Sequence, residues 1–203
     1  KVYKLMNNYR GLGQHDLAAL EDALTRLSVM VADNINPNSG DFVFLGTMYF
    51  YTFANNTANE TTSVLKKGDW ILDYYFQFGY GTNSRIVFTN ESGNLTANLA
   101  GDAHIARAQG STVELVHKAG DWVVSKKHVQ VASGVNSTAI IEKEGGNWTV
   151  ENNFVICKGT GSTATIHHKG GNFTVGGYLS VGDLAGANLA TMIISGGTVH
   201  STH

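Results

Sequence analysis

The side chains best suited to chemistry in this chain are its eight histidines, since imidazole is a common metal ligand. A zinc site requires three or four ligands converging within about 2.3 Å of one point. The histidines of the second half of the chain are scattered, without a cluster of cysteines or carboxylates, at positions 104, 117, 128, 167, 168, 200 and 203. His167 and His168 are adjacent, so on a strand they point to opposite faces. We expect surface histidines, no metal site and no cofactor.

A second group that could do chemistry is Asp102, His104 and Arg107, an acid and two bases within six residues. Inverting cleavage of a polysaccharide would need a further carboxylate several ångströms away on the same face. The other acids weighed for that role fall at dissimilar repeat positions: Asp73, Glu151 and Asp183. The chain also lacks a nucleophile motif, a phosphate loop and a cofactor fingerprint. We therefore expect a protein that is not an enzyme.

The elements that must position these side chains follow from a repeat. A glycine, usually followed by an acid or amide and then always by an apolar residue, recurs at intervals of 25 to 28 residues, at Gly40, Gly68, Gly93, Gly120, Gly146, Gly171 and Gly197. Such a period is typical of stacked repeats, in which each unit completes its core against its neighbours. Between the glycines, apolar residues alternate with polar ones, as in half-buried strands. We predict an all-β fold, a parallel β-solenoid of about seven coils, with three short strands in each coil of about 26 residues.

Aligning the coils places residues in columns. Trp122, Trp148 and Phe173 share one column and are predicted to stack in the core. Val155 and Cys157 are predicted to face inward, with Cys157 as a small buried residue. Charges of alternating sign form a column whose main role would be to fix the register of the coils: Lys66, Glu91, Lys118, Glu144 and Lys169. A threonine column is predicted from Thr62, Thr112, Thr138, Thr163 and Thr191, with Arg85 intruding.

Residues 1–38 differ from the repeats and are expected to be a separate N-terminal segment, followed by the solenoid domain at 39–203. Asp16 can cap a helix whose apolar residues run from Leu17 to Val31 at spacings of three and four. Because a solenoid exposes an open strand edge at each end, we predict that this amphipathic helix covers the first coil. A docking helix for a partner is the alternative.

Composition narrows the function. The net charge is −2 with 15% charged residues, and no basic stripe favours nucleic-acid binding. No stretch reaches the roughly 20 apolar residues of a membrane span. Seven Asn-x-Ser/Thr sequons are present, some of which the repeat itself explains. The candidate glycosylation sites are Asn55, Asn59, Asn90 and Asn136.

The segments 145–150, 170–182 and 194–199, which include Gly170-Gly171-Asn172-Phe173-Thr174-Val175 and Ile194-Ser195-Gly196-Gly197-Thr198-Val199, carry a resemblance. They are similar to the repeats of secreted bacterial β-solenoid proteins of the autotransporter-passenger and PEP-CTERM-associated types. The similarity covers residues 111–203. It implies an exported protein, extracellular or at the cell surface.

We expect a non-enzymatic structural protein, a subunit of a surface fibre, stalk or adhesin. The alternatives are a carbohydrate-binding or polysaccharide-cleaving β-helix, or a viral fibre segment. Aromatic residues crowd residues 40–80, where both alternating faces of the strands are apolar. Large exposed apolar patches are rare on monomers. The expected partner is therefore a second copy of the chain, with Tyr49, Tyr51 and Tyr75 at the interface, and surface glycans are a further candidate.

Overall fold

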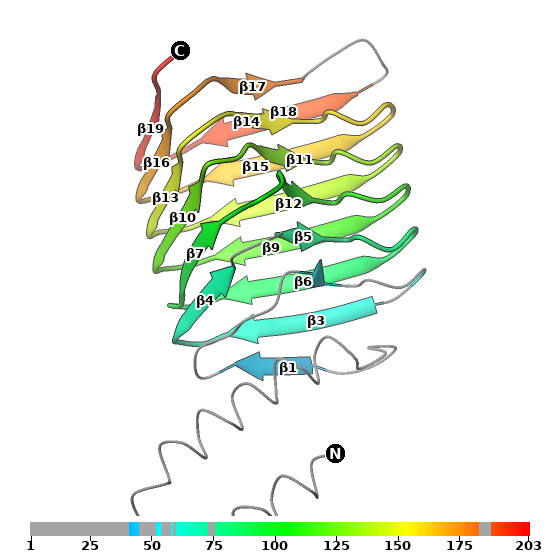
Figure 1. The fold of residues 1–203 in the computed structure, drawn as a ribbon, viewed down its shortest axis with the longest axis horizontal. Coiled ribbons are helices and arrows are strands. Elements are labelled where there is room, and N and C mark those ends of the chain that lie inside the picture. The colour runs from blue at the N-terminus through cyan, green and yellow to red at the C-terminus, as the bar shows by residue number, and fades with distance from the viewer. Residues whose placement is uncertain (1–40, 45–51, 54–57, 59, 73–75, 183–187) are drawn as a thin grey trace, which may run out of the picture.

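A computed structural model describes residues 41–44, 52–53, 58, 60–72, 76–182 and 188–203. The regular secondary structure of this part of the chain consists of β-strands alone, and every strand pair is parallel. The strands wind into a solenoid whose turns stack from the N-terminal to the C-terminal side (Figure 1). The predicted all-β parallel β-solenoid is confirmed.

The strands form three sheets, in which neighbours come from successive turns. Sheet A consists of β1 (Asp41–Phe44), β3 (Glu60–Leu65), β6 (Arg85–Asn90), β9 (Thr112–His117), β12 (Thr138–Lys143), β15 (Thr163–His168) and β18 (Leu189–Ile194). Sheet B consists of β4 (Asp69–Leu72), β7 (Asn94–Asn98), β10 (Asp121–Ser125), β13 (Asn147–Val150), β16 (Asn172–Val175) and β19 (Thr198–Ser201). Sheet C consists of β2 (Thr52–Phe53), β5 (Gln77–Phe78), β8 (Ala103–Ile105), β11 (Val129–Val131), β14 (Phe154–Ile156) and β17 (Leu179–Val181).

Within the described residues, five turns contribute a strand to all three sheets, from β3–β4–β5 to β15–β16–β17. Strands β1 and β2 precede them, and β18 and β19 follow. The structure thus shows a solenoid of about five complete turns rather than the full set of seven that the glycine motifs predict. The helix predicted between Leu17 and Val31, with the rest of residues 1–38, lies outside the described residues.

The core is filled by the inward-facing columns of the three sheets. Trp122, Trp148 and Phe173 pair in register and are at most 4% exposed, so their predicted stacking inside the solenoid is confirmed. Leu95 and Trp70 continue the column toward the N-terminal side. Cys157 is buried as predicted, and its burial raises the pKa of the thiol. At about 25 cal/mol per Å² of buried apolar surface, this continuous core is the main favourable term in folding.

The glycine of the repeat is required by contact between successive turns. Gly146 has a φ of +64°, and a Cβ there would lie 2.0 Å from the carbonyl oxygen of Gly120 in the preceding turn. Gly120, Gly171 and Gly197 share both features. The corner between sheets A and B therefore excludes side chains because adjacent backbones touch, and not only because the dihedral angle favours glycine.

The corner between sheets C and A alternates two residue types. Asn83, Gly110, Asn136 and Gly161 occupy equivalent places in four successive turns, all with positive φ. The Oδ1 atom of Asn83 lies where a Cβ of Gly110 would be, 2.2 Å away, and Asn136 stands in the same relation to Gly161. Each asparagine side chain thus covers a glycine of the next turn.

Two alignments predicted from the sequence place residues in the wrong register. Thr112, Thr138 and Thr163 do form a column, but the strand pairing places Thr62 and Thr191 in the adjacent column. In sheet C, Phe154 and Ile156 face the core, whereas Val155, predicted to face inward, pairs with Gln130 on the other side of the strand. Val155 and Gln130 are nevertheless only 5% and 7% exposed, so polarity alternation is weak there.

Candidate functional site

The corner between sheets A and B contains a column of buried polar side chains. Asn90, His117, Lys143 and His168 end successive strands of sheet A, pair in register, and are at most 1% exposed. Leu65 and Ile194 occupy the same column on either side of them. The prediction of surface histidines is therefore wrong for His117 and His168, whose side chains point into the corner.

Asn90, His117 and Lys143 donate hydrogen bonds to carbonyl groups at the glycine corner. Lys143 Nζ donates to the carbonyl oxygens of Gly145 (3.1 Å), Gly146 (2.7 Å) and Gly170 (2.7 Å). Burial lowers the pKa of Lys143 to about 8, against the opposing effect of Asp121. Because an ammonium has three donors, its cage of carbonyl oxygens accepts all of them.

His117 links two turns through both ring nitrogens. Its Nε2 lies 3.1 Å from the Gly120 carbonyl oxygen, which can only accept, so Nε2 carries the proton and Nδ1 accepts from Asn90 Nδ2 at 3.0 Å. Burial lowers the pKa of His117 to about 4, and Lys143 adds to the shift.

The ring nitrogens of His168 form no hydrogen bond within the described residues. Burial and Lys143 lower the pKa of His168 as well, while backbone groups of Gly171 and Thr198 oppose the shift. We assign this column a structural role, because its four side chains are at most 1% exposed and three of them bind backbone carbonyl groups.

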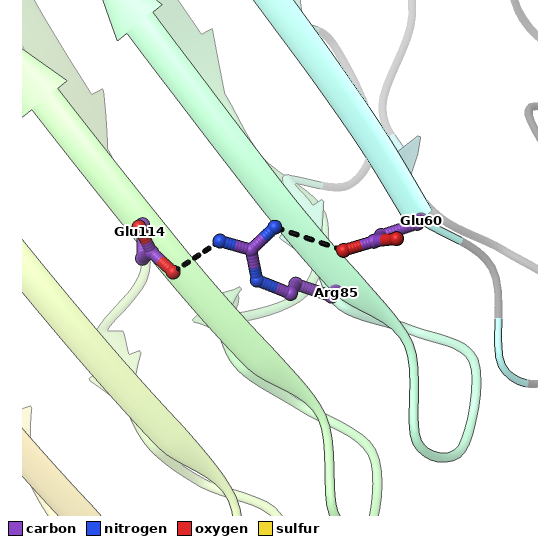
Figure 2. Close-up of polar contacts among 3 residues, drawn as sticks. All are labelled: Glu60, Arg85 and Glu114. Atoms are coloured by element: carbon purple, nitrogen blue, oxygen red, sulfur yellow. Dashed lines mark hydrogen bonds and ion pairs between the residues drawn. The ribbon is translucent and has the colours of Figure 1, made fainter. Parts of the chain in front are cut away.

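The outer face of sheet A carries an ion-pair network near its N-terminal side. Figure 2 shows the guanidinium of Arg85 between the carboxylates of Glu60 (2.9 Å) and Glu114 (2.7 Å). Hydrogen bonds with Glu114 and Glu60 raise the pKa of Arg85. The three residues lie on three successive strands, so the network ties their register, with a small contribution to stability because all three side chains are exposed.

The predicted column of alternating charges is aligned as expected. Backbone hydrogen bonds place Glu91, Lys118, Glu144 and Lys169 one residue after the buried polar column. The ion pair that Lys169 forms, however, is with Glu142 rather than Glu144. Within the described residues no ion pair joins two members of the column, so its role in fixing the register stays a prediction.

The outer face of sheet B carries a ladder of acid and amide side chains. Asn94 Nδ2 donates to Asp69 Oδ1 (3.1 Å), and Asn147 Nδ2 donates to Asp121 Oδ1 (2.8 Å). A shallow groove of about 430 Å³ runs over the first three rungs, lined by Asp69, Ile71, Asn94, Thr96, Asp121 and Val123. The groove thus combines hydrogen-bonding groups with an apolar strip.

The residues weighed for catalysis lie together on sheet C, but each has a partner within the fold. Asp102 accepts from Gln130 Nε2 (2.6 Å) and from the His128 backbone N–H (3.3 Å). His104 Nδ1 lies 3.0 Å from Ser133 Oγ, and the Arg107 guanidinium stacks over the Tyr80 ring at 4.8 Å. Burial lowers the pKa of His104 to about 4, with Arg107 adding to the shift. A histidine of so low a pKa is a poor general base at neutral pH.

Sequence reasoning missed Ser133 and Lys158, which occupy the same place as Arg107 in the next two turns. The pairing of Val131 with Ile105 and with Ile156 sets this register, which places Ser133 and Lys158 level with Arg107. The signal available in the sequence was the alignment of Gly134 with Gly159. An alignment on the other glycines of the repeat does not reveal the column of Arg107, Ser133 and Lys158.

The C-terminal side of the solenoid presents edge strands. Strands β17, β18 and β19 are the outermost strands of sheets C, A and B on that side (Figure 1). Leu189 is 63% exposed, Ile194 55% and Ile193 44%, whereas the equivalent positions one turn earlier are less exposed. The three strands contain no Asp, Glu, Lys or Arg.

The structure describes only some of the predicted interface and glycosylation residues. Tyr49, Tyr51 and Tyr75 lie outside the described residues, as do Asn55 and Asn59. Asn136 is exposed, at the corner between sheets C and A. Asn90 is a correction: it is fully buried, and its Nδ2 donates to the carbonyl oxygens of Gly93 (2.7 Å) and Ala119 (2.9 Å). A glycan on that nitrogen is incompatible with this fold.

Comparison with protein-family models, curated proteins and solved structures found no match to this chain. Among the described residues, none forms a helix long and apolar enough to span a membrane. A search of the same residues for three or more His, Cys, Asp or Glu side chains placed to hold a metal ion found no such group.

Proposed function

We propose that this chain is a non-enzymatic structural protein outside the cell, a subunit of a surface fibre, stalk or adhesin that associates with itself. The observation that supports this proposal is the edge formed by β17, β18 and β19. Soluble proteins protect exposed strand edges with charged side chains, and these strands have none. They also expose Leu189, Ile193 and Ile194.

A second copy of the chain suits this edge. The backbone hydrogen-bonding groups of the edge strands point along the stack, so another solenoid can add its strands to all three sheets. A head-to-tail contact of this kind does not close and leads to a filament. Tyr49, Tyr51 and Tyr75 complete the proposed interface from the N-terminal side.

The finer features of the architecture belong to the same proposal. The seven glycine motifs support seven coils, and the apolar spacing from Leu17 to Val31 supports a capping helix. The likeness of residues 111–203 to exported bacterial solenoid repeats supports an extracellular or surface location. Asn55, Asn59 and Asn136 remain the candidate glycosylation sites.

Sedimentation velocity of the 203-residue chain tests self-association. We expect species larger than the monomer at tens of micromolar, and their loss in Leu189→Lys and Ile194→Lys. Ile140→Lys is the matched control, because Ile140 is also exposed (42%) on sheet A but lies away from the edge. Circular dichroism establishes that each variant is folded. A wild-type chain that stays monomeric contradicts the proposal.

Carbohydrate binding is the second candidate function, favoured by the groove on sheet B. Carboxylate and amide groups of Asp69, Asn94 and Asp121 are suited to sugar hydroxyls, and Ile71 and Val123 to the apolar faces of the rings. A glycan array probed with the wild type and with Asp69→Ala tests it. Asn172→Ala, on the same ladder beyond the groove, is the control. Loss of a glycan signal in Asp69→Ala alone supports this function, and the absence of any signal in the wild type rejects it.

A further inference from the structure

Three polar side chains form a column along the outer edge of sheet C. Arg107, Ser133 and Lys158 follow the buried residues Ala106, Ala132 and Cys157 in three successive turns. Neighbouring turns in a solenoid are about 4.8 Å apart. The two cations therefore flank one serine hydroxyl, one turn to each side. Arg107 and Ser133 are partly exposed and Lys158 is exposed, so solvent reaches all three.

The positive charges of this column are not neutralised within the described residues. The ion pairs of that part of the chain involve Arg85 and Lys169, and neither Arg107 nor Lys158 takes part in one. The guanidinium carbon of Arg107 lies over the Tyr80 ring, 4.8 Å from its centroid. This cation–π contact holds the guanidinium at the Tyr80 ring, which does not compete for its N–H donors as a carboxylate would.

His104 completes the cluster from the adjacent column. Its Nδ1 lies 3.0 Å from Ser133 Oγ, which orients the hydroxyl. Burial, Arg107 and Lys158 together lower the pKa of His104 to about 4, against the opposing effect of Asp102. Both oxygens of Asp102 are already held by Gln130 and the His128 backbone. The register of sheet C places Arg107 and Lys158 one turn to each side of Ser133, so a group bound at the Ser133 hydroxyl has a cation on either side.

We propose that Arg107, Ser133, Lys158 and His104 form a binding site for a single oxyanion, of the sulfate or carboxylate kind displayed by acidic polysaccharides. Arg107 and Lys158 would donate charge-assisted hydrogen bonds to the oxyanion, and Ser133 a neutral one. The site is local: the net charge of the chain is −2, so a long polyanion held by a continuous basic stripe does not fit. A polymer that presents one anionic group to each binding site does fit.

Isothermal titration with dextran sulfate, polygalacturonate and neutral dextran tests the site and separates its sources. We expect binding of one or both acidic polymers and none of neutral dextran, with an affinity that falls as salt is raised. Sulfate selectivity assigns the site to sulfated glycans, and carboxylate selectivity to uronic acids. Arg107→Ala and Lys158→Ala should each weaken binding about tenfold. Ser133→Ala should weaken it less.

A second readout follows His104 directly by NMR of its imidazole. A bound anion favours the charged ring, so the polymer should raise the pKa of His104 from about 4. Lys118→Ala is the matched control, since Lys118 is an exposed lysine at the corner between sheets A and B. Equal weakening in Lys118→Ala would reveal diffuse attraction and overturn the proposal. Equal binding of neutral dextran, or an unchanged His104 pKa in the complex, would overturn it too.

Discussion

The indole rings of Trp122 and Trp148 lie parallel in the core, with 5.2 Å between ring centroids and 2° between planes. They come from the same position of two successive turns, so the stacking distance is close to the separation of neighbouring strands. Phe173, one turn later, meets Trp148 edge to face at 5.7 Å. The flat stack is thus a property of two identical side chains held in parallel register.

Trp148→Ala should lower the free energy of unfolding by about 3–5 kcal/mol, because it removes ring contacts on both sides and leaves a cavity. Trp148→Phe should cost about 1 kcal/mol or less. It keeps most of the packing, and it removes an Nε1 that is buried without a hydrogen-bond partner in the described residues. Urea unfolding measures both, with the outward-facing Thr149→Ala as control. A near-neutral Trp148→Ala would contradict the core assignment.

Lys143→Met should destabilise the fold by about 2–3 kcal/mol, because the carbonyl oxygens of Gly145, Gly146 and Gly170 lose their donor. The same variant removes a positive charge that lowers the pKa of His117, so that pKa should rise. Denaturant unfolding and NMR titration measure the two effects. Lys118→Met, one column away and exposed, should change stability by about 0.5 kcal/mol or less. A His117 pKa that stays at its wild-type value in Lys143→Met would be evidence against the stacked column.

Stability should fall as the pH drops from about 6.5 to about 4. The pKa of His117 is lowered from its ordinary value of 6.5 to about 4, so the unfolded chain takes up the proton first and the folded state loses stability across that window. The loss from this residue is on the order of 3 kcal/mol.

His117→Asn tests the pH dependence, since Asn90 fills the same column one turn earlier. At pH 7 the variant should be as stable as the wild type or less stable. On acidification its free energy of unfolding should decline less steeply than that of the wild type. His200→Asn, at an exposed position on β19, should keep the wild-type slope. Unfolding curves recorded between pH 4 and 7.5 measure the slopes. Identical slopes in His117→Asn and the wild type would refute the assignment.

Gly146→Ala should destabilise far more than Gly182→Ala, although both glycines have positive φ. A Cβ at Gly146 would overlap the Gly120 carbonyl oxygen at 2.0 Å, whereas the nearest atom of the described residues to a Cβ at Gly182 is the Ala190 Cβ at 3.8 Å. Gly182→Ala should cost only the left-handed strain of about 1–2 kcal/mol. Thermal unfolding of both variants decides whether contact between turns or backbone strain dominates. Equal losses of stability would favour strain.

The fold could be predicted from the sequence because the same local requirement recurs in every turn. A glycine with an apolar residue two positions later recurs from Gly68-Asp69-Trp70 to Gly197-Thr198-Val199, and this pattern can be read without tertiary information. From Gly120 onward, the repeat glycine also touches the backbone of the preceding turn. The core stacking of Trp122 with Trp148 followed directly. Register was harder, because turns differ in length by up to three residues. For that reason Thr62 and Thr191 were placed in the wrong column.

The buried polar column and the sheet C cluster could not be predicted in the same way. Histidine and lysine are usually exposed, and the reason that His117 and Lys143 are buried is a set of glycine carbonyl oxygens visible only when turns are stacked. Ser133 and Lys158 belong to no sequence motif. They can be recognised as candidate site residues only because the fold places them beside Arg107 and His104. The shared position three residues before each repeat glycine was the available signal for the buried column.

The alternation of asparagine and glycine between sheets C and A limits how this solenoid can change length during evolution or design. Each asparagine amide fills the space that a side chain at the next turn would need. Deleting the one turn that contains Gly110 would place Asn136 directly above Asn83, and the Asn83 amide would then have to move away from the Asn136 Cβ. Removing two consecutive turns instead places Gly161 above Asn83 and keeps the pattern. Between Asn83 and Gly161, a change of length by a pair of turns is therefore the one that leaves the asparagine side chains in place.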